Sequence, residues 1–316
     1  MNAPAPNSDA IRRAETVLRA ACGERLRTRF VLAPLTTFRI GGPAALFLEP
    51  ESEADLVAAS EAVRDAEIPF AILGKGSNVL VADDGFPGLV LRLGRGYRWS
   101  ARAGDRLTAG GAMPLPALAG VALSHRLSGL EFGVAIPASL GGAVRMNAGA
   151  HGGELAEVVE GVEVFRLLTG ATETIRRTEA RFSYRRSGLP ADVVVIAASI
   201  ALRPGEAVEI RARMTEAREW RRRTQPLAEP NCGSVFKNPV GDHAARLIEK
   251  VGAKGLTVGG ASISTKHANF VVAADGTRAA DVVALIREVK GRVEDRTGIQ
   301  LEPEVHLVGD LDLAAR

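Results

Sequence analysis

The chain has 316 residues, of which 46% are hydrophobic and 24% are charged, and its formal net charge at pH 7 is +3. These values are those of an ordinary globular protein, and the small net charge and the scarcity of Trp and Tyr argue against a nucleic-acid-binding surface. Two distant cysteines and five scattered histidines indicate neither a disulfide framework nor a metal site. No apolar run is long enough to span a membrane, and MNAPAPNSDA is not a secretory signal. We therefore expect a cytoplasmic protein that binds no metal, nucleic acid or membrane.

The first part of the chain is predicted to form a small α/β unit, residues 21–93, after a disordered or short helical head at 1–20. Ser52 and Asp55 have the spacing of a capping box, and apolar residues then recur at helical spacing. The predicted elements are strands at 44–49, 69–73 and 88–93 and a helix at 52–66. The alternation of strands with a helix favours a packed α/β layer.

A second unit, residues 94–208, is predicted to be richer in strands. Its expected elements are a helix at 114–127, a hairpin at 161–175 that turns at Thr169-Gly170, and a strand at 192–203. A basic helix at 207–224 then leads into a third unit, residues 209–300. Two further helices are expected there, at 242–252 and 278–297. Residues 301–316 are predicted to be a C-terminal strand segment that carries Glu304.

Two glycine-rich segments, 74-GKGSNVLV-81 and 133-GVAIPASLGGAVRMNAGAHGG-153, need an explanation. Neither matches the common phosphate-binding or dinucleotide-binding loop motifs. Successive main-chain N–H groups can still form a concave anion site, and Gly141 and Gly142 would let a diphosphate approach closely. Short polar side chains lie beside these amides: Ser77, Asn78, Ser139 and Asn147. The residues alone leave two interpretations open, a dinucleotide site and tight packing of loops between sheets.

Seven motifs follow one another along the chain: 37-TFRIGG-42, 74-GKGSNVLV-81, 131-EFGVAIPASLGGAVRMNAGAHGGE-154, 182-FSYRRS-187, 224-TQP-226, 233-GSVFKNP-239 and 301-LEPEVHLVG-309. In this order they together resemble the UDP-N-acetylenolpyruvoylglucosamine reductase family, also called UDP-N-acetylmuramate dehydrogenases. The resemblance implies an α+β fold, with a two-lobed FAD-binding domain of the vanillyl-alcohol-oxidase/PCMH type and a C-terminal α+β substrate-binding domain. The lobes would be residues 21–93 and 94–208. No insert follows FSYR, which is typical of the family's shorter form without a substrate-clamp loop.

The same resemblance implies an activity in peptidoglycan precursor synthesis. NADPH would reduce a non-covalently bound FAD, and the reduced flavin would pass hydride from N5 to the enolpyruvyl group of UDP-N-acetylglucosamine enolpyruvate, giving UDP-N-acetylmuramate. The partner is thus a small molecule, and we expect a monomer. Bare backbone in the glycine segments would lie against the cofactor. The residues expected at FAD are Arg39, Gly74, Lys75, Gly76, Ser77, Asn78, Val79, Leu80, Ile136, Pro137, Ser139, Gly141, Gly142, Ala143, Asn147, Ala148, Gly149 and Ala150.

Three catalytic residues follow from the resemblance: Arg185, Ser234 and Glu304. Ser234 would protonate the substrate carbon, and Arg185 would stabilise the enolate, because a guanidinium stays charged and can bind a carboxylate through two hydrogen bonds. Glu304 would act as an assisting acid. The pattern alone does not separate Arg185 from Arg186, or Glu304 from Glu302, which would face the same side of a strand; the family motif selects the first of each pair.

For the UDP group, the resemblance implies four residues and one completing segment. They are Tyr184, Arg222, Lys237 and Asn238, with 264-STKHAN-269 expected to complete the pocket. Cys232 stands where family members commonly have Ala, and we interpret it as a small buried filler.

Some features of the sequence also fit two alternative functions. A flavin alcohol oxidase of the same fold would tether FAD through a histidine, and His151 lies in the second glycine segment. A UDP-sugar-binding regulator that has lost redox activity would carry no flavin. The GSVFKNP and LEPEV motifs argue against the first, and the presence of all three catalytic residues argues against the second.

Overall fold

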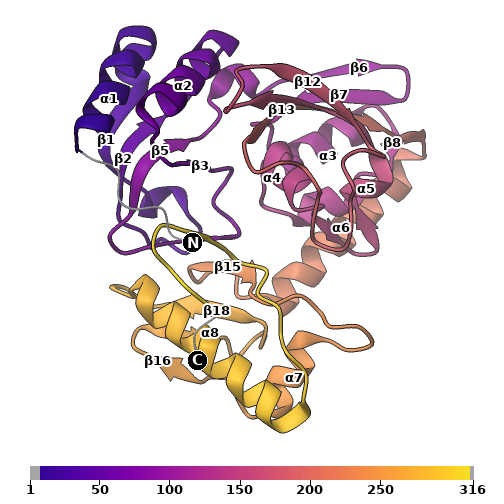
Figure 1. Cartoon of the computed structure of the whole chain (residues 1–316). Coiled ribbons are helices and arrows are strands. Elements are labelled where there is room, and N and C mark those ends of the chain that lie inside the picture. Colours follow the sequence, from indigo (N-terminus) through magenta and orange to yellow (C-terminus); the bar gives the residue numbers. More distant parts are fainter. Residues whose placement is uncertain (1–7, 314–316) are drawn as a thin grey trace.

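The computed structural model describes residues 8–313, so the part of the predicted head before Ser8 and the residues after 313 lie outside the described range. Figure 1 shows two sheet-containing lobes side by side and a C-terminal domain beneath them. The long helix α6 (Ala207–Thr224) runs from the second lobe into this domain. The three parts surround a central region that the glycine segments enter.

The N-terminal lobe is an α/β layer. Its elements are α1 (Ser8–Cys22), β1 (Leu26–Val31), β2 (Pro43–Leu48), α2 (Glu53–Ala66), β3 (Phe70–Ile72), β4 (Val79–Val81) and β5 (Phe86–Leu91), with 3-10 turns η1 (Gly23–Arg25), η2 (Ala33–Leu35) and η3 (Arg95–Tyr97). The sheet order is β1-β2-β5-β3, in which β1 is antiparallel to β2 and the other pairs are parallel. The predicted capping box is present, because the Ser52 side chain accepts a hydrogen bond from the Asp55 N–H at 3.3 Å.

Much of the predicted head is an ordered helix, because α1 extends through Cys22 and packs on α2. Ala14 and Leu18 are fully buried on α1, and Leu56 and Ala59 are fully buried on α2. Burial of this apolar stripe stabilises a helix that would be marginal alone. The apolar residues of this stripe were not distinguished in the sequence from the polar residues that precede them.

The middle lobe is built on an antiparallel sheet. Its elements are β6 (Ser100–Ala103), β7 (Arg106–Gly110), α3 (Leu115–Ser124), β8 (Leu127–Ser128), η4 (Glu131–Ala135), α4 (Leu140–Arg145), β9 (Gly149–Ala150), β10 (Gly153–Glu154), α5 (Leu155–Val158), β11 (Val159–Arg166), β12 (Thr172–Arg176), β13 (Val193–Ala201) and β14 (Arg203–Pro204). The five-stranded order is β12-β11-β13-β7-β6, and helices α3, α4 and α5 lie on one side of this sheet. The predicted hairpin at 161–175 is confirmed as β11 and β12, and the predicted helix at 207–224 is confirmed as α6.

The C-terminal domain packs a sheet against a long helix. Its elements are β15 (Asn231–Ser234), α7 (Ala244–Lys250), β16 (Thr257–Val258), β17 (Ala261–Ile263), β18 (Phe270–Ala273), α8 (Ala279–Thr297) and β19 (His306–Val308), and its sheet order is β15-β18-β17-β16. The predicted apolar side of the long helix is confirmed: Val282, Leu285, Ile286, Val289 and Val293 are all fully buried.

The C-terminal strand segment predicted from residue 301 is wrong for most of its length, because only His306–Val308 form a strand. Pro303 makes a single bridge to Phe236, and the Glu304 N–H donates to the Val235 carbonyl at 2.7 Å. The strand β19 starts only at His306, where the chain crosses to the N-terminal lobe and pairs in parallel with β4. Glu302 and Glu304 therefore differ in exposure: the side chain of Glu302 is 69% exposed and that of Glu304 is 15% exposed.

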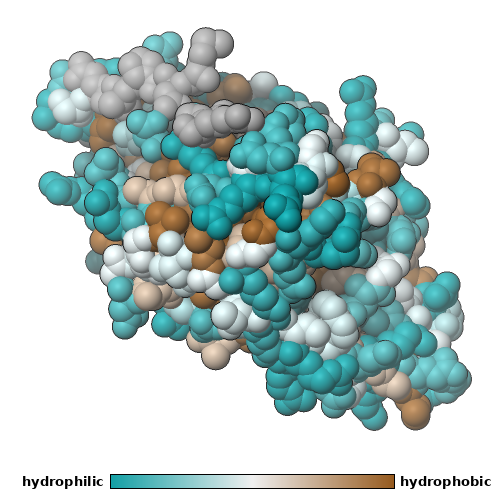
Figure 2. Space-filling model, turned by 90° about the horizontal axis from the view of Figure 1, so that it is seen from below, coloured by the Kyte–Doolittle hydropathy of each residue, from teal (hydrophilic) through white to brown (hydrophobic). Residues whose placement is uncertain are grey.

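The hydrophobic clusters cross the lobes. Phe165 and Ile196 of the middle lobe pack with the α1–α2 core, while Phe38 and Leu80 of the N-terminal lobe pack with the C-terminal core. The domain boundaries after residues 93 and 208 remain predictions. The face shown in Figure 2 is mainly hydrophilic, and its apolar residues lie in small groups. Within residues 8–313, none of the helices combines the length and the apolar character that crossing a bilayer requires.

Candidate active site

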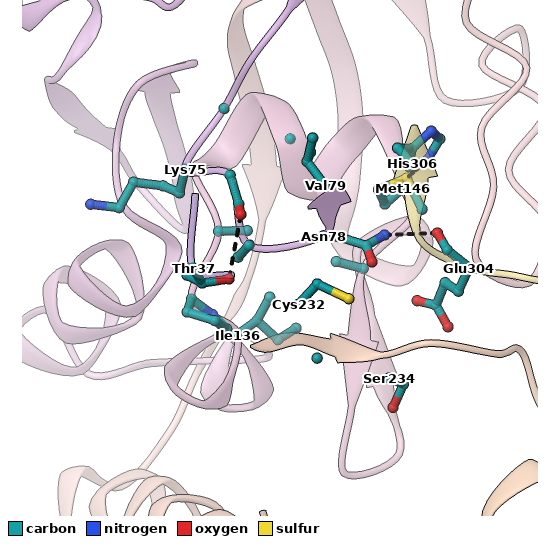
Figure 3. A pocket seen from close by; sticks show the side chains of 18 of the residues that line it. Thr37, Lys75, Asn78, Val79, Ile136, Met146, Cys232, Ser234, Glu304 and His306 are labelled. Carbon is teal, nitrogen blue, oxygen red and sulfur yellow. Dashed lines mark hydrogen bonds between the residues drawn. The ribbon is translucent and has the colours of Figure 1, made fainter. Parts of the chain in front are cut away.

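A cavity of about 1090 Å³ lies where the three parts meet. It is lined by the loop between β3 and β4, by residues 135–150, by the Tyr184–Arg185 turn, by the segment after α6, and by β15 and the chain around Glu304. Figure 3 shows Thr37 and Lys75 toward one end of this cavity and Ser234 and Glu304 toward the other. The volume lies above the usual upper range for one drug-sized ligand, about 1000 Å³, so the cavity has room for two molecules together.

The two glycine segments form one wall of the cavity. The Thr37 N–H and hydroxyl both donate to the Gly76 carbonyl, at 3.0 and 3.3 Å, and Gly76 has a positive φ of 63°. A Cβ at Gly76 would lie 2.2 Å from the Leu35 carbonyl oxygen, so only glycine fits this turn. Helix α4 lies within the second glycine segment, and at its start the Ser139 hydroxyl accepts a hydrogen bond from the Gly142 N–H at 3.4 Å.

Fifteen of the eighteen residues predicted at the cofactor line this cavity: Arg39, Gly74, Lys75, Gly76, Ser77, Asn78, Val79, Ile136, Pro137, Ser139, Gly142, Ala143, Ala148, Gly149 and Ala150. Apart from its chain neighbours and the backbone of α4, the closest atom to a Cβ placed on Gly142 is the Ser139 hydroxyl oxygen at 3.4 Å, so the absence of a side chain leaves this space to the cavity. Cationic side chains line the same space: Arg39, Lys75, Arg145, Arg185 and Arg221. Bare backbone with nearby cations fits a long anionic dinucleotide such as FAD.

The structure does not bring the other three predicted cofactor residues to the cavity. The Leu80 side chain is fully buried in the C-terminal core cluster, because alternate residues of β4 point to opposite faces. Gly141 lines a neighbouring cavity of about 230 Å³ instead. Asn147 is 0% exposed, and both polar atoms of its carboxamide bond to protein backbone. The predicted contact of Asn147 with FAD is therefore wrong.

Arg185 and Glu304 meet across the cavity wall. The Arg185 Nε lies 3.6 Å from a carboxylate oxygen of Glu304, and Arg185 Nη2 donates to the Gly149 carbonyl at 2.8 Å. Burial raises the pKa of Glu304 above its ordinary value, and the nearby Arg185 and Lys237 oppose this shift. A carboxyl group with a raised pKa carries a proton more readily near neutral pH, which suits an acid.

Ser234 lies at the end of β15, on the same cavity. Its hydroxyl has no hydrogen-bond partner among residues 8–313, so it is free to face a ligand. Gly233 before it has a positive φ of 80°, which turns the chain at this point. Cys232 is 1% exposed, as a filler would be, and burial raises the pKa of its thiol.

Of the residues predicted at UDP, the structure brings two to the cavity. Tyr184 and Asn238 line it, and Arg185 lies over the Tyr184 ring with Cζ 4.9 Å from the ring centroid. Lys237 is not a lining residue; its ammonium pairs with Glu302 at 2.6 Å, although its charge still acts on Glu304. Arg222 does not line it either: neighbouring positions on α6 point in different directions, and Arg221 is the one that faces the cavity. From the segment 264-STKHAN-269, only Asn269 reaches the lining.

Several lining residues were not predicted from the sequence. Thr37, Gln225 and His306 lie inside quoted motifs, but the motifs did not single them out. Arg145 was noticeable as the one basic residue of the second glycine segment; its guanidinium donates to the carbonyls of Leu189, Pro190 and Val193 at 2.7 to 3.0 Å. Burial lowers the pKa of Arg145 and of Arg221. Nothing in the sequence distinguishes Arg221 from the arginines beside it.

His151 is not a lining residue of the cavity. Its ring lies against Trp220 of α6, with the two ring centroids 5.0 Å apart. The structure therefore gives no support to a histidine tether for FAD at this position.

Comparison with known proteins supports the same conclusion. A family model described as an FAD binding domain matches residues 44–178. The solved structure of Phl p 4.0202, a glucose dehydrogenase, has a TM-score of 0.50 at 14% identity, covering 61% of this chain and 44% of that chain, and this likeness shows the fold alone. Together with the cavity, these findings define the class: a flavoprotein with a two-lobed FAD-binding domain of the PCMH type. The predicted fold class and the FAD cofactor are confirmed.

A second family model, UDP-N-acetylenolpyruvoylglucosamine reductase, C-terminal domain, matches residues 225–308. The chain is 46% identical over 302 residues to the UDP-N-acetylenolpyruvoylglucosamine reductase of Anaeromyxobacter sp. (strain Fw109-5), covering 96% of this chain and 94% of that protein. The crystal structure of this reductase from Thermus caldophilus superposes with a TM-score of 0.79 at 39% identity and covers 90% of this chain and 99% of that one. The chain belongs to the UDP-N-acetylenolpyruvoylglucosamine reductase family, and it is an oxidoreductase.

Proposed function

We propose that this protein uses NADPH and FAD to reduce UDP-N-acetylglucosamine enolpyruvate to UDP-N-acetylmuramate in peptidoglycan precursor synthesis. One observation carries the proposal: Arg185, Ser234 and Glu304 come from distant segments and line the same cavity as both glycine segments. The reaction requires a redox cofactor, a cation for the developing enolate and a proton donor on one substrate. The glycine segments could hold the cofactor, Arg185 is the cation, and Ser234 is the proton donor.

The glycine segments are proposed to hold FAD, with Arg39 and Lys75 beside its diphosphate. When bound, FAD supplies the reducing equivalents for the vinyl carbon of the substrate. The main chain of residues 74–79 and 136–150 would orient it, and residues of the C-terminal domain line the far side of the cavity. NADPH is proposed to reduce the flavin first and to leave before the substrate enters.

The proposed roles of the three catalytic residues follow from their surroundings. Arg185 would bind the substrate carboxylate and stabilise negative charge as the enolate forms, because its guanidinium is held in place by Glu304 and by the Gly149 carbonyl. Ser234 would donate its proton to the substrate carbon. Glu304, whose pKa is raised by burial, would assist as a hydrogen-bond donor when it is protonated.

The UDP group is proposed to lie between the C-terminal domain and α6, beside Tyr184, Asn238 and Arg221. We further propose a cytoplasmic monomer. Both cysteines, Cys22 and Cys232, are free and buried, which supports a reducing compartment. After FSYR, residues 187–192 alone separate Arg186 from β13, which supports assignment to the shorter form.

The decisive experiment is anaerobic. The enzyme is reduced with NADPH, the enolpyruvyl substrate is added, and reoxidation of the flavin is followed by absorbance. The parent should reoxidise, and Ser234→Ala should lose about 10²- to 10⁴-fold in this step while its reduction by NADPH is unchanged, because a general acid contributes about that much. Ser124→Ala, on α3 away from the cavity, is the matched control. Reoxidation of Ser234→Ala at the parent rate would refute the assignment of the proton donor.

The alternatives are tested on the purified protein. Acid precipitation should leave the flavin in the supernatant, since His151 contacts Trp220 and is not among the residues that line the cavity. Flavin that stays with the pellet would instead indicate a covalent tether. A protein without flavin after reconstitution with FAD would favour a regulator.

A further inference from the structure

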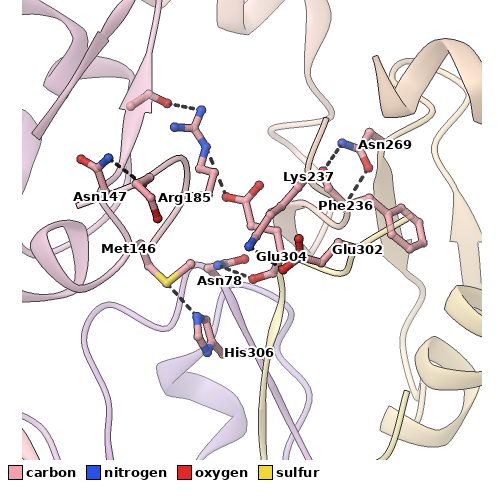
Figure 4. A network of polar contacts seen from close by, with 12 residues as sticks. Asn78, Met146, Asn147, Arg185, Phe236, Lys237, Asn269, Glu302, Glu304 and His306 are labelled. Atoms are coloured by element: carbon pink, nitrogen blue, oxygen red, sulfur yellow. Dashed lines mark hydrogen bonds and ion pairs between the residues drawn. The ribbon is translucent and has the colours of Figure 1, made fainter. Parts of the chain in front are cut away.

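Three asparagine side chains bond to the main chain of the three segments that carry the proposed catalytic residues. Figure 4 shows Asn147 near Arg185, Asn269 beside Phe236, and Asn78 beside Glu304. In Asn147 and Asn269 both polar atoms of the carboxamide bond to backbone. The inference drawn from them rests on the proposed function, because it concerns the placement of Arg185, Ser234 and Glu304.

Asn147 holds the turn that carries Arg185. Its amide nitrogen donates to the Ser183 carbonyl at 2.9 Å, and its oxygen accepts from the Ala156 N–H at 2.8 Å. Ser183 and Arg186 exchange two backbone hydrogen bonds, at 2.9 and 3.0 Å, so residues 184 and 185 form the tip of a tight turn. Arg185 sits there with a positive φ of 54°, a conformation that a side-chain-bearing residue adopts only when its neighbours hold it. Fixing Ser183 therefore fixes Arg185.

Asn269 holds the segment after Ser234. Its oxygen accepts from the Phe236 N–H at 3.0 Å, and its nitrogen donates to the carbonyl of the same residue at 2.8 Å. The carbonyl of Asn269 also accepts from the Val235 N–H at 2.9 Å. Ser234 itself pairs with Phe270 between β15 and β18. The backbone is thus bound at Ser234 and at the two residues that follow it.

Asn78 joins the glycine loop to Glu304. Its amide nitrogen donates to the Glu304 carbonyl at 3.0 Å, and its own carbonyl accepts from the His306 N–H at 3.0 Å. The Glu304 N–H in turn donates to the Val235 carbonyl at 2.7 Å. Glu304 is therefore bonded on one side to the loop expected at FAD and on the other to the strand segment that carries Ser234.

We propose that Asn78, Asn147 and Asn269 are positioning residues that align Glu304, Arg185 and Ser234 by fixing the backbone beneath them. A carboxamide suits this task because it donates and accepts at once and stays neutral, so it adds no charge beside Arg185 or Glu304. Replacing it with a carboxylate removes the donor and leaves a buried carbonyl without its partner. An error of about 1 Å in a catalytic group can cost about 100-fold in rate, so this alignment matters to the reaction.

Asn147 gives the sharpest test, because it is 0% exposed and cannot contact a ligand. Asn147→Asp keeps the acceptor for Ala156 and loses the donor to Ser183. We expect flavin reoxidation by the enolpyruvyl substrate to slow by about 10- to 100-fold while reduction by NADPH stays within about threefold of the parent. Ser60→Ala is the matched control, since it also removes a buried donor to a main-chain carbonyl, that of Leu167, away from the cavity.

A double-mutant cycle separates positioning from simple loss of stability. In an Arg185→Ala background, Asn147→Asp should change the reoxidation rate by less than about threefold, because it acts through Arg185 and residues that act as a unit are not additive. Equal losses in both backgrounds, or no loss in the parent, would overturn the proposal. If Asn147→Asp does not fold, the same cycle with Asn269→Asp and Ser234→Ala decides it by the same criteria. A parent that the substrate fails to reoxidise would refute the proposed function instead.

Discussion

The two walls of the cavity are built in different ways. The glycine wall comes from two continuous segments, residues 74–79 and 136–150, and presents mainly backbone. The catalytic wall presents the side chains of Arg185, Ser234 and Glu304, which come from a turn, a strand end and an irregular segment. The first wall tolerates few added atoms, whereas the second tolerates little displacement. Substitutions on the two walls should therefore damage different steps.

The largest effect is expected on the catalytic wall. Arg185→Ala should slow flavin reoxidation by the substrate by about 100- to 1000-fold, the usual cost of removing one group that stabilises a developing negative charge. The flavin content and the reduction by NADPH should stay close to those of the parent, because Arg185 contacts Gly149 through only one hydrogen bond. Stopped-flow absorbance measures both steps. Loss of flavin from Arg185→Ala would remove the functional distinction between the walls.

A second prediction concerns the glycine wall. Gly142→Val should weaken FAD binding by about 10-fold or more, because the added side chain occupies cavity space that backbone leaves open, at a cost of about 1.4 kcal/mol or more. Flavin absorbance after dialysis, together with the melting temperature, gives the result. Gly120→Val on α3, where a Cβ would meet no atom within 4 Å, is the matched control. Normal flavin retention by Gly142→Val would place the cofactor elsewhere.

A third prediction concerns pH and stability. Burial raises the pKa of Glu304 above its ordinary value of 4.5, so in the window above pH 4.5 the folded protein binds more protons than the unfolded chain. The contribution of Glu304 to the free energy of unfolding therefore falls as the pH rises through this window. Glu304→Gln should lose this part of the dependence, so the variant should gain stability relative to the parent as pH increases. Urea unfolding at several pH values between 4.5 and 8 measures the difference, and parallel curves would contradict it.

The smallest effect is expected at the cysteines. Burial raises the pKa of Cys22 to about 11, with Asp55 contributing, and burial also raises the pKa of Cys232. Neither thiol should react with an aromatic disulfide reagent at pH 8 until denaturant is added, because the thiolate is the reactive form. The variant Cys22→Ala keeps only Cys232. Rapid reaction of this variant with the reagent would therefore show that Cys232 becomes accessible, and that the catalytic wall opens in solution.

The contrast between the walls also explains what the sequence could predict. The glycine wall is contiguous, so its composition alone suggested a site for a dinucleotide, although loop packing remained an equal interpretation. Capping at Ser52, the turn at Thr169-Gly170 and the apolar side of α8 were likewise predictable, because their signals lie within a few residues of one another. Resemblance to a family, and not spacing, brought Arg185, Ser234 and Glu304 together.

The errors have one physical cause, since a residue's type does not fix its direction. Asn147 has the chemistry expected at a cofactor but bonds to Ser183 and Ala156, and Leu80 lies in the predicted segment but, on β4, points into the core. Arg221, not Arg222, faces the cavity because of the phase of α6. Long-range packing decides each of these cases, and no local signal in a single sequence reports it.

The pairing of β19 with β4 has a consequence for protein synthesis. The chain that leaves the ribosome first carries the glycine loop and β4, and Glu304, which completes the catalytic trio, emerges more than two hundred positions later, immediately before β19. Within residues 8–313, the strand partner of β4 is β19, and Asn78 bonds to Glu304 and His306. The end of the glycine loop therefore gains these contacts only after the last residue of the catalytic trio has been synthesised.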